Sequence, residues 1–379
     1  MNYDYFFIGL SFSASVFSTF LCLVLLGLKL AKNTCDLAVK KAIVILISFF
    51  AISIFFYSTT FFEAFSLVRL SYIKELNFQS ALLMPILFYH FIFELTRLKK
   101  ADKFYYFNYV TCITIGLSLY FFQTKQGNPH AGIHFPVQGF PSFWVAKEAI
   151  LLASMYNVIY LTLSLYRLIR YRKNISNYSS NEEQDSLLWL YPIFVLGFLL
   201  LPGSIVFYVV PVVKQHLFFG QLLPNGLFMF FAISLCYNVF CENFALGTED
   251  ILEETITANK LKKTKEKELF INKDTFEQYI AEKKPFLNPQ LKITDLLYDL
   301  MTNRSYLSQF INTTYKMNFS QYINHCRYQE YLRLQASLGA TKKTQEDMIL
   351  ASGFRSYESF KRTQDSFLER EGADRRISS

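Results

Sequence analysis

The sequence predicts an all-α protein: a seven-span transmembrane helix bundle followed by a cytoplasmic all-α domain with two helix-turn-helix units. Hydrophobic residues make up 52% of the 379 positions and charged residues only 18%, whereas an ordinary soluble domain carries about 25% charged residues. The charges are also unevenly placed, with 28 in the 246 residues up to Leu246 and 40 in the 133 that follow. The chain is therefore neither a single soluble globule nor a disordered protein.

Seven apolar stretches of the N-terminal part reach the roughly 20 residues that a membrane-spanning helix needs. They lie at 6–28, 42–62, 77–96, 104–122, 144–166, 188–212 and 218–245. We expect the first stretch to be a span rather than a cleaved signal peptide, because its apolar run is too long, no positive residue precedes it and further spans follow. Each stretch predicts one helix of a bundle in contact with membrane lipid.

The orientation of the bundle follows from the positive residues of its loops. With the N-terminus outside, the inner loops hold twelve Lys and Arg residues and the outer segments hold five. Positive loops stay on the cytoplasmic side, and an odd number of spans then places everything after Leu246 in the cytoplasm. The prediction is a multi-pass protein of the bacterial inner (cytoplasmic) membrane.

Ionisable residues inside the spans are candidates for function, because a charged group is costly in hydrocarbon. His90 and Glu94 lie four residues apart on one helical face of the third span, and Arg97 follows three residues later. We consider His90 and Glu94 an intramembrane signal site. Interhelical hydrogen bonding that fixes the packing, with a Glu94–Arg97 ion pair at the inner rim, is the alternative.

The domain boundaries follow changes in composition. They are a transmembrane domain over 1–246, a charged helical linker over 247–284, a second domain over 285–372 and a disordered tail over 373–379. The lysines of the linker could attract anionic lipid, at about 1 kcal/mol each, or form a solvated helix face.

The six cysteines show neither a Cys-x-x-Cys pair nor a zinc-like spacing with His. We expect them to be buried free thiols. No phosphate-binding glycine loop, nucleophile motif or metal-ligand set occurs in the sequence. The prediction is a protein without cofactor, metal or catalytic residues, and no enzyme.

The C-terminal part has the pattern of short amphipathic helices joined by turns. Residues 293–300 carry apolar side chains at 293, 296, 297 and 300, which is typical of a helix with one buried stripe. Asn303 is suited to cap a second helix over 304–315. Its inward face would hold Leu307, Phe310 and Ile311, and its outward face Arg304, Ser305, Ser308, Gln309 and Asn312. A longer helix over 320–335 follows, then a helix over 344–351, a turn at 352–354 and a helix over 356–367.

These runs carry a resemblance to a known family. The matching segments are Lys284–Leu291, Asn303–Phe310, Asn318–Asn324 with Arg327, and Ala351–Ser356 with Phe360. In this order and spacing they resemble the DNA-binding domain of the arabinose-operon regulator (AraC/XylS) family, in which one long helix joins two helix-turn-helix units. Together with the spans, the chain resembles the membrane-embedded members of that family. The family's turn glycine corresponds to Met301, so we expect a turn without positive φ there.

The resemblance implies double-stranded DNA as the partner and assigns roles by matching positions. Base contacts would come from Ser305, Ser308 and Gln309 in the first recognition helix, and from Tyr357, Glu358 and Arg362 in the second. Phosphate contacts would come from Arg304, Lys316 and Lys361. A good pair such as Gln309 with adenine or Arg362 with guanine gives about 1–3 kcal/mol of discrimination. The alternative for each residue is an ordinary solvated helix position.

The resemblance predicts a transcription regulator that senses a small-molecule or protein signal through its spans. Two other classes of function remain as alternatives. The first is a membrane receptor or transporter whose cytoplasmic helices bind a protein. The second is a membrane-embedded enzyme that uses His90 and Glu94. The net charge of residues 247–379 is only +2, so DNA binding would depend on individual contact residues more than on total charge. If the protein forms a homodimer, the two copies would read a longer DNA site.

Overall fold

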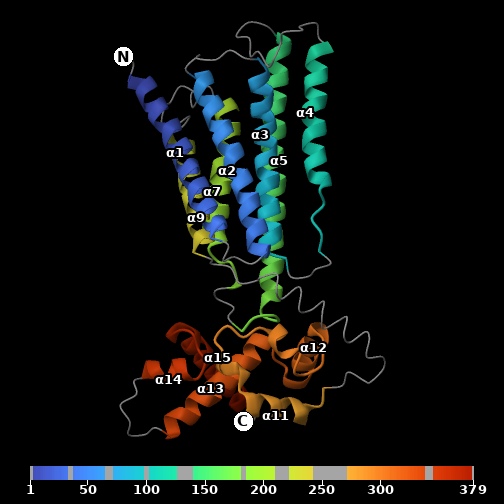
Figure 1. Ribbon diagram of the computed structural model, residues 1–379, viewed down its shortest axis with the longest axis vertical. Helices are drawn as coiled ribbons and strands as arrows, with labels where there is room; N and C mark the ends of the chain where they lie inside the picture. Colours follow the sequence, from blue (N-terminus) through green and yellow to red (C-terminus); the bar gives the residue numbers. More distant parts are fainter. Residues whose placement is uncertain are drawn as a thin grey trace. The chain divides into compact units, whose positions relative to one another are not determined.

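The computed structural model describes residues 3–32, 37–64, 71–97, 102–125, 140–180, 185–209, 222–241, 271–337 and 345–377 (Figure 1). Over these ranges all regular elements are helices, and one isolated antiparallel bridge joins Ser179 to Lys292. The chain forms two compact units. Unit 1 comprises Met1–Arg170 and Leu188–Gly247, and unit 2 comprises Tyr171–Leu187 and Thr248–Ser379. The all-α class predicted from the sequence is confirmed.

Unit 1 is built from long apolar helices that run alongside one another (Figure 1). They are α1 (Tyr3–Ala31), α2 (Leu37–Ala64), α3 (Ser71–Leu95), α4 (Phe107–Lys125), α5 (Phe140–Ile175), α7 (Leu190–Val209) and α9 (Leu223–Phe240). Within the described residues, five stretches are long and apolar enough to cross a membrane: Gly9–Ala31, Val39–Phe62, Leu76–Leu95, Leu151–Ile175 and Leu223–Phe240. Helices α4 and α7 contribute the shorter apolar stretches Phe107–Ser118 and Leu190–Leu200. The helices are compatible with a multi-pass membrane protein.

Polar contacts join α1 to α9 along the length of the pair. Asn225 donates its amide to Ser11 Oγ at 2.8 Å, and at the other end the Lys29 ammonium donates to the Val239 carbonyl oxygen at 2.9 Å. A cation is favourable at a helix C-terminus, because the last carbonyl groups have no partner in the helix. Lys29 therefore caps α9 and stays satisfied although it is only 8% exposed.

Unit 2 contains shorter helices around a core of its own. They are α11 (Lys273–Lys283), the 3-10 turns η2 (Pro285–Leu287) and η3 (Ile293–Leu296), α12 (Arg304–Tyr315), α13 (Phe319–Ser337), α14 (Gln345–Ala351) and α15 (Tyr357–Ile377). Phe276 and Ile280 of α11 pack in one core cluster with Leu307, Ile311 and Phe319. Helix α11 is therefore part of this unit, whereas the sequence placed it in a linker that ended at residue 284. The N-terminal part of that linker, up to residue 270, lies outside the described residues.

The segment 293–300 differs from the α-helix expected there. It forms the 3-10 turn η3, which Asp295 caps by accepting from the Lys292 N–H at 2.8 Å, followed by further turns. The apolar pattern is satisfied all the same, because Ile293, Leu296 and Leu297 are buried. A turn without positive φ at Met301 was also wrong: its φ is 47°. Met301 is 76% exposed, and its left-handed backbone costs about 1–2 kcal/mol of local strain.

Five cysteines lie among the described residues, and all are free. Cys22, Cys112 and Cys236 are buried as predicted. The prediction was wrong for Cys241, which is exposed at the end of α9.

Candidate functional site

Helix α12 presents a polar face to solvent because its apolar positions are locked into the core. Asn303 caps the helix as predicted, accepting from the Tyr306 N–H at 2.9 Å. Leu307 and Ile311 are fully buried. Residues one and two positions away therefore point outward: Ser305 and Gln309 are exposed, and Ser308 is half-buried. The Gln309 side chain makes no hydrogen bond to any described residue, so its amide is available to a ligand.

Helix α15 is oriented in the same way by a second cluster of apolar side chains. Phe360 is fully buried, with its ring 4.5 Å from that of Tyr331 of α13 and 5.5 Å from that of Phe354. The side chains predicted to reach DNA from this helix are all exposed: Tyr357, Glu358, Lys361 and Arg362. Both α12 and α15 pack against α13.

The turn between α14 and α15 depends on Gly353. Its φ of +93° is a conformation that L side chains rarely adopt. A Cβ at this position would also collide with the Phe286 carbonyl oxygen and lie 2.8 Å from the Leu287 Cα. Glycine is therefore required here both by the backbone conformation and by the close approach of η2.

The charged residues predicted to contact phosphate lie in different surroundings. Lys316, in a left-handed conformation after α12, is exposed, as is Lys361. Arg304 was expected on the outward face of α12, and this was wrong: it is only 7% exposed. Its guanidinium carbon lies 4.1 Å from the centre of the Tyr178 ring. A phosphate contact by Arg304 stays a prediction, and it requires Arg304 to leave this position.

Arg327 is the central buried cation of unit 2, at 2% exposure. Its guanidinium donates to the carbonyl oxygens of Phe286 (2.8 Å) and Asn288 (2.7 Å), to Asn324 Oδ1 (3.0 Å) and to Ser180 Oγ (3.0 Å). Burial lowers its pKa to about 10, so the group is charged at neutral pH. Arg327 thereby fastens the η2 region, and a segment far away in the sequence, to α13.

That distant segment is 176–180, which follows the last residue of α5 and belongs to unit 2. The Ser180 N–H donates to the Leu291 carbonyl at 3.1 Å, the Ile293 N–H to the Tyr178 carbonyl at 3.0 Å, and the Ser320 N–H to the Ser176 carbonyl at 3.0 Å. Sequence reasoning missed this segment. Its run of Ser and Asn predicts only a polar loop, and pairing over more than 100 residues leaves no local signal.

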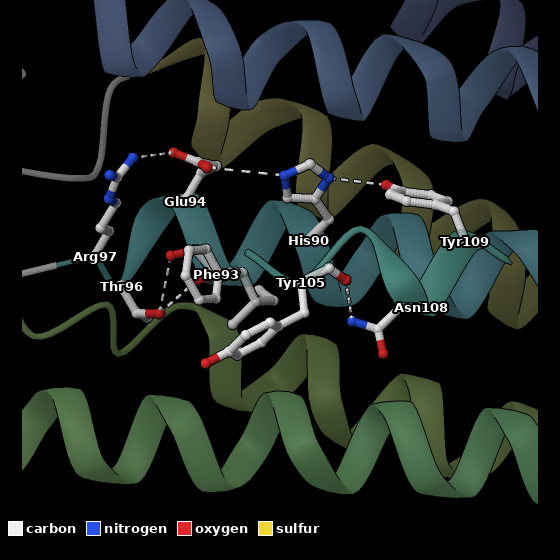
Figure 2. A network of polar contacts seen from close by, with 9 residues as sticks. His90, Phe93, Glu94, Thr96, Arg97, Tyr105, Asn108 and Tyr109 are labelled. Atoms are coloured by element: carbon white, nitrogen blue, oxygen red, sulfur yellow. Dashed lines mark hydrogen bonds and ion pairs between the residues drawn. The ribbon is translucent and has the colours of Figure 1, made fainter. Parts of the chain in front are cut away.

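In unit 1, His90 occupies the centre of a polar cluster on α3 (Figure 2). Its Nδ1 lies 2.8 Å from the Tyr109 hydroxyl of α4, and its Nε2 lies 3.8 Å from Glu94 Oε1. Glu94 also pairs with Arg97 at 3.7 Å, which is the ion pair of the alternative interpretation. The Phe104 ring stacks on the imidazole at a centroid distance of 3.8 Å. The cluster therefore supplies the interhelical hydrogen bond that we considered as the alternative to a signal site.

Further polar contacts continue from this cluster to α5. The Tyr160 hydroxyl of α5 donates to Asn108 Oδ1 at 3.0 Å, and Arg167 Nε of α5 donates to Thr96 Oγ1 at 2.8 Å. The Arg167 guanidinium also lies over the Phe93 ring at 3.8 Å. Helices α3, α4 and α5 are thus linked by hydrogen bonds near His90.

Comparisons of the chain with protein-family models, with curated proteins and with solved structures found no match. Among the described residues, no group of three or more His, Cys, Asp or Glu side chains could hold a metal ion. The exposed faces of α12 and α15 and the polar cluster of unit 1 are therefore the candidate functional sites.

Proposed function

We propose that the protein is a membrane-bound one-component transcription regulator with seven spans, its N-terminus outside and unit 2 in the cytoplasm. The observation that carries the proposal is the outward face of α12, where Ser305, Ser308 and Gln309 stand on a capped helix with a buried apolar stripe. Hydroxyl and amide groups suit hydrogen bonds to base edges in the major groove. These are also the positions that the family resemblance assigns to base contacts.

Two recognition helices would read one bipartite site. In this proposal the η3 turns take the place of the first helix of the first unit, and α12 is its second helix; α14 and α15, joined by the turn at Gly353, are the second unit. Both pack on α13, as expected where one long helix spaces two readers. Recognition helices about one duplex turn apart enter successive major grooves on the same face of DNA.

The sensing step belongs to unit 1. We place it at His90 and Glu94. His90 is paired with Glu94 on its own helix α3 and with Tyr109 on α4, so a change in these contacts would change how α3 packs against α4. A signal that exchanged the His90–Tyr109 bond for another would loosen α3 from α4. Replacing His90 by Phe keeps an aromatic ring on Phe104 but removes the polar nitrogens. This variant should respond differently to the signal, and without the signal it should bind DNA with the affinity of the wild-type protein.

The test of DNA binding uses the full chain in lipid nanodiscs. The affinity of the protein for the DNA upstream of its own gene is compared with its affinity for a random duplex of equal length, at 50 and 200 mM salt. We expect selective binding that salt weakens and that Gln309→Ala reduces by about 5- to 150-fold, since one bidentate base contact gives about 1–3 kcal/mol. The matched control is Gln329→Ala, which removes an exposed amide from α13 and should leave affinity unchanged.

Equal binding to both duplexes, or none, would contradict the proposal. Either result would favour a receptor whose cytoplasmic helices bind a protein. Retained selectivity in Gln309→Ala would contradict the assignment of α12 as the reader.

A further inference from the structure

Helix α5 contributes residues to both units. Its apolar stretch Leu151–Ile175 is long enough to cross a membrane, and its last residues, from Tyr171 on, already belong to unit 2. The next five residues, 176–180, are the docking segment, which is held on unit 2 at several points. The chain passes between the two units three times: within α5, between Leu187 and Leu188 ahead of α7, and after Gly247.

The docking segment is an integral part of unit 2. Three backbone hydrogen bonds join it to Leu291, Ile293 and Ser320. Ser179 and Ser180 are 1% and 2% exposed, and the Ser180 hydroxyl donates to the Leu291 carbonyl at 2.7 Å while it accepts from Arg327. A displacement of α5 would therefore act directly on the elements next to α12.

One side chain of the docking segment covers the start of α12. The Tyr178 ring lies over Arg304, the first residue of this helix, at 4.1 Å. The N-terminus of a recognition helix is a place where phosphates bind, because its N–H groups and dipole favour negative charge. A cation that is 7% exposed beneath an aromatic ring cannot reach a phosphate from this position.

We propose that the docking segment is an autoinhibitory contact, in which Tyr178 withholds Arg304 from the DNA backbone until the segment is drawn away. This inference rests on the proposed DNA-binding function. It makes Arg304 a conditional phosphate contact, with α5 as the element whose movement decides whether the contact forms. The partner is the phosphate backbone of duplex DNA, so the effect is independent of base sequence.

Tyr178→Ala tests the proposal in the full chain in lipid nanodiscs. We expect binding to a random duplex to become about 3- to 10-fold tighter, because removing the ring uncovers one cation beside the start of α12 for contact with one phosphate. The plot of log affinity against log salt concentration should steepen by about 0.9, the value for one more phosphate contact. In an Arg304→Ala background, Tyr178→Ala should lose both effects.

Two further variants separate the ring from the fold. Tyr178→Phe keeps the ring and should leave affinity and salt slope unchanged, and Tyr178→Leu, which fills similar space without a π face, should act like Tyr178→Ala. Asn177→Ala, the neighbouring half-buried position, is the control. The urea midpoint of unit 2 shows whether Tyr178→Ala folds. If it does not fold, the affinity and salt slope of Tyr178→Leu are used in its place.

The inference is overturned if both ring-removing variants leave affinity and slope unchanged, or weaken binding, or act equally with and without Arg304. The proposed function fails in a different way, because wild-type protein would then bind its upstream region no better than the random duplex. The two outcomes can be told apart in one set of titrations.

Discussion

Replacing the buried Arg327 by Met should destabilise unit 2 more than replacing any exposed residue of α13. Methionine has a similar length and keeps the apolar contacts of the Arg stem, but it donates no hydrogen bond. Four acceptors then lose a partner: the carbonyls of Phe286 and Asn288, Asn324 Oδ1 and Ser180 Oγ.

The magnitude follows from which acceptors stay buried. Asn288 is exposed and Asn324 half-buried, so water replaces the guanidinium there. Phe286 and Ser180 are 6% and 2% exposed, and a buried group without its partner costs about 1–3 kcal/mol. Methionine carries no charge, so the variant no longer has to bury one, and this offsets part of the cost. We expect a net loss of about 2–4 kcal/mol.

Pulse proteolysis of the full chain in nanodiscs, with urea as denaturant, measures this loss from the cleavage of unit 2. With a slope of about 2 kcal/mol per molar urea, the midpoint should fall by about 1–2 M. Arg333→Met is the matched control, because Arg333 lies on the same helix with its side chain 64% exposed and should shift the midpoint far less. Equal midpoints for Arg327→Met and wild type would refute the reasoning that the buried guanidinium holds the η2 region on α13.

Three further predictions concern unit 2 and use the same urea midpoint. Gly353→Ala should lower stability by at least about 2 kcal/mol, because the new Cβ meets the backbone of η2 at a positive φ; an unchanged midpoint would contradict the observed turn. Met301→Gly should raise stability by about 0.5 kcal/mol, as relief of the left-handed backbone exceeds the entropy cost of glycine, and a lower midpoint would argue against the positive φ. Burial tends to raise the pKa of Glu330, but hydrogen bonds from Arg333 and Lys284 hold this pKa below its ordinary value. Its contribution is thus present above the ordinary carboxyl pKa and lost as pH falls through the lowered value. Glu330→Gln should therefore flatten the acid loss of stability, whereas an identical pH profile would exclude this carboxylate as a source.

The sequence predicts the elements that depend on local pattern. The sequence predicts Asn303 as an N-cap because Asn is strongly preferred at that position, and α13 and α15 begin close to the expected residues. The pairing of Glu94 with Arg97 also follows from spacing on one helix face. These features require only residues within one or two turns of each other.

The features that could not be predicted depend on partners far away in the chain. The docking segment bonds to residues more than 100 positions later, so neither its burial nor the covering of Arg304 by Tyr178 leaves a local trace. The η3 segment has the apolar spacing of an α-helix, but it forms a tighter 3-10 turn in which the Asp295 carboxylate accepts the hydrogen bond of the Lys292 N–H. Met301 occupies a left-handed turn because the surrounding helices fix the direction of the chain more strongly than the residue's own preference.

The central claim, that α12 and α15 are two readers of one DNA site, is tested most directly by hydroxyl-radical footprinting. The full chain in nanodiscs is bound to its own upstream region, and protection is mapped at single-nucleotide resolution. We predict two protected blocks on one face of the duplex, about 10 base pairs apart. Gln309→Ala should weaken one block and Arg362→Ala the other. A uniform pattern, or one in which neither substitution changes a block, would contradict it.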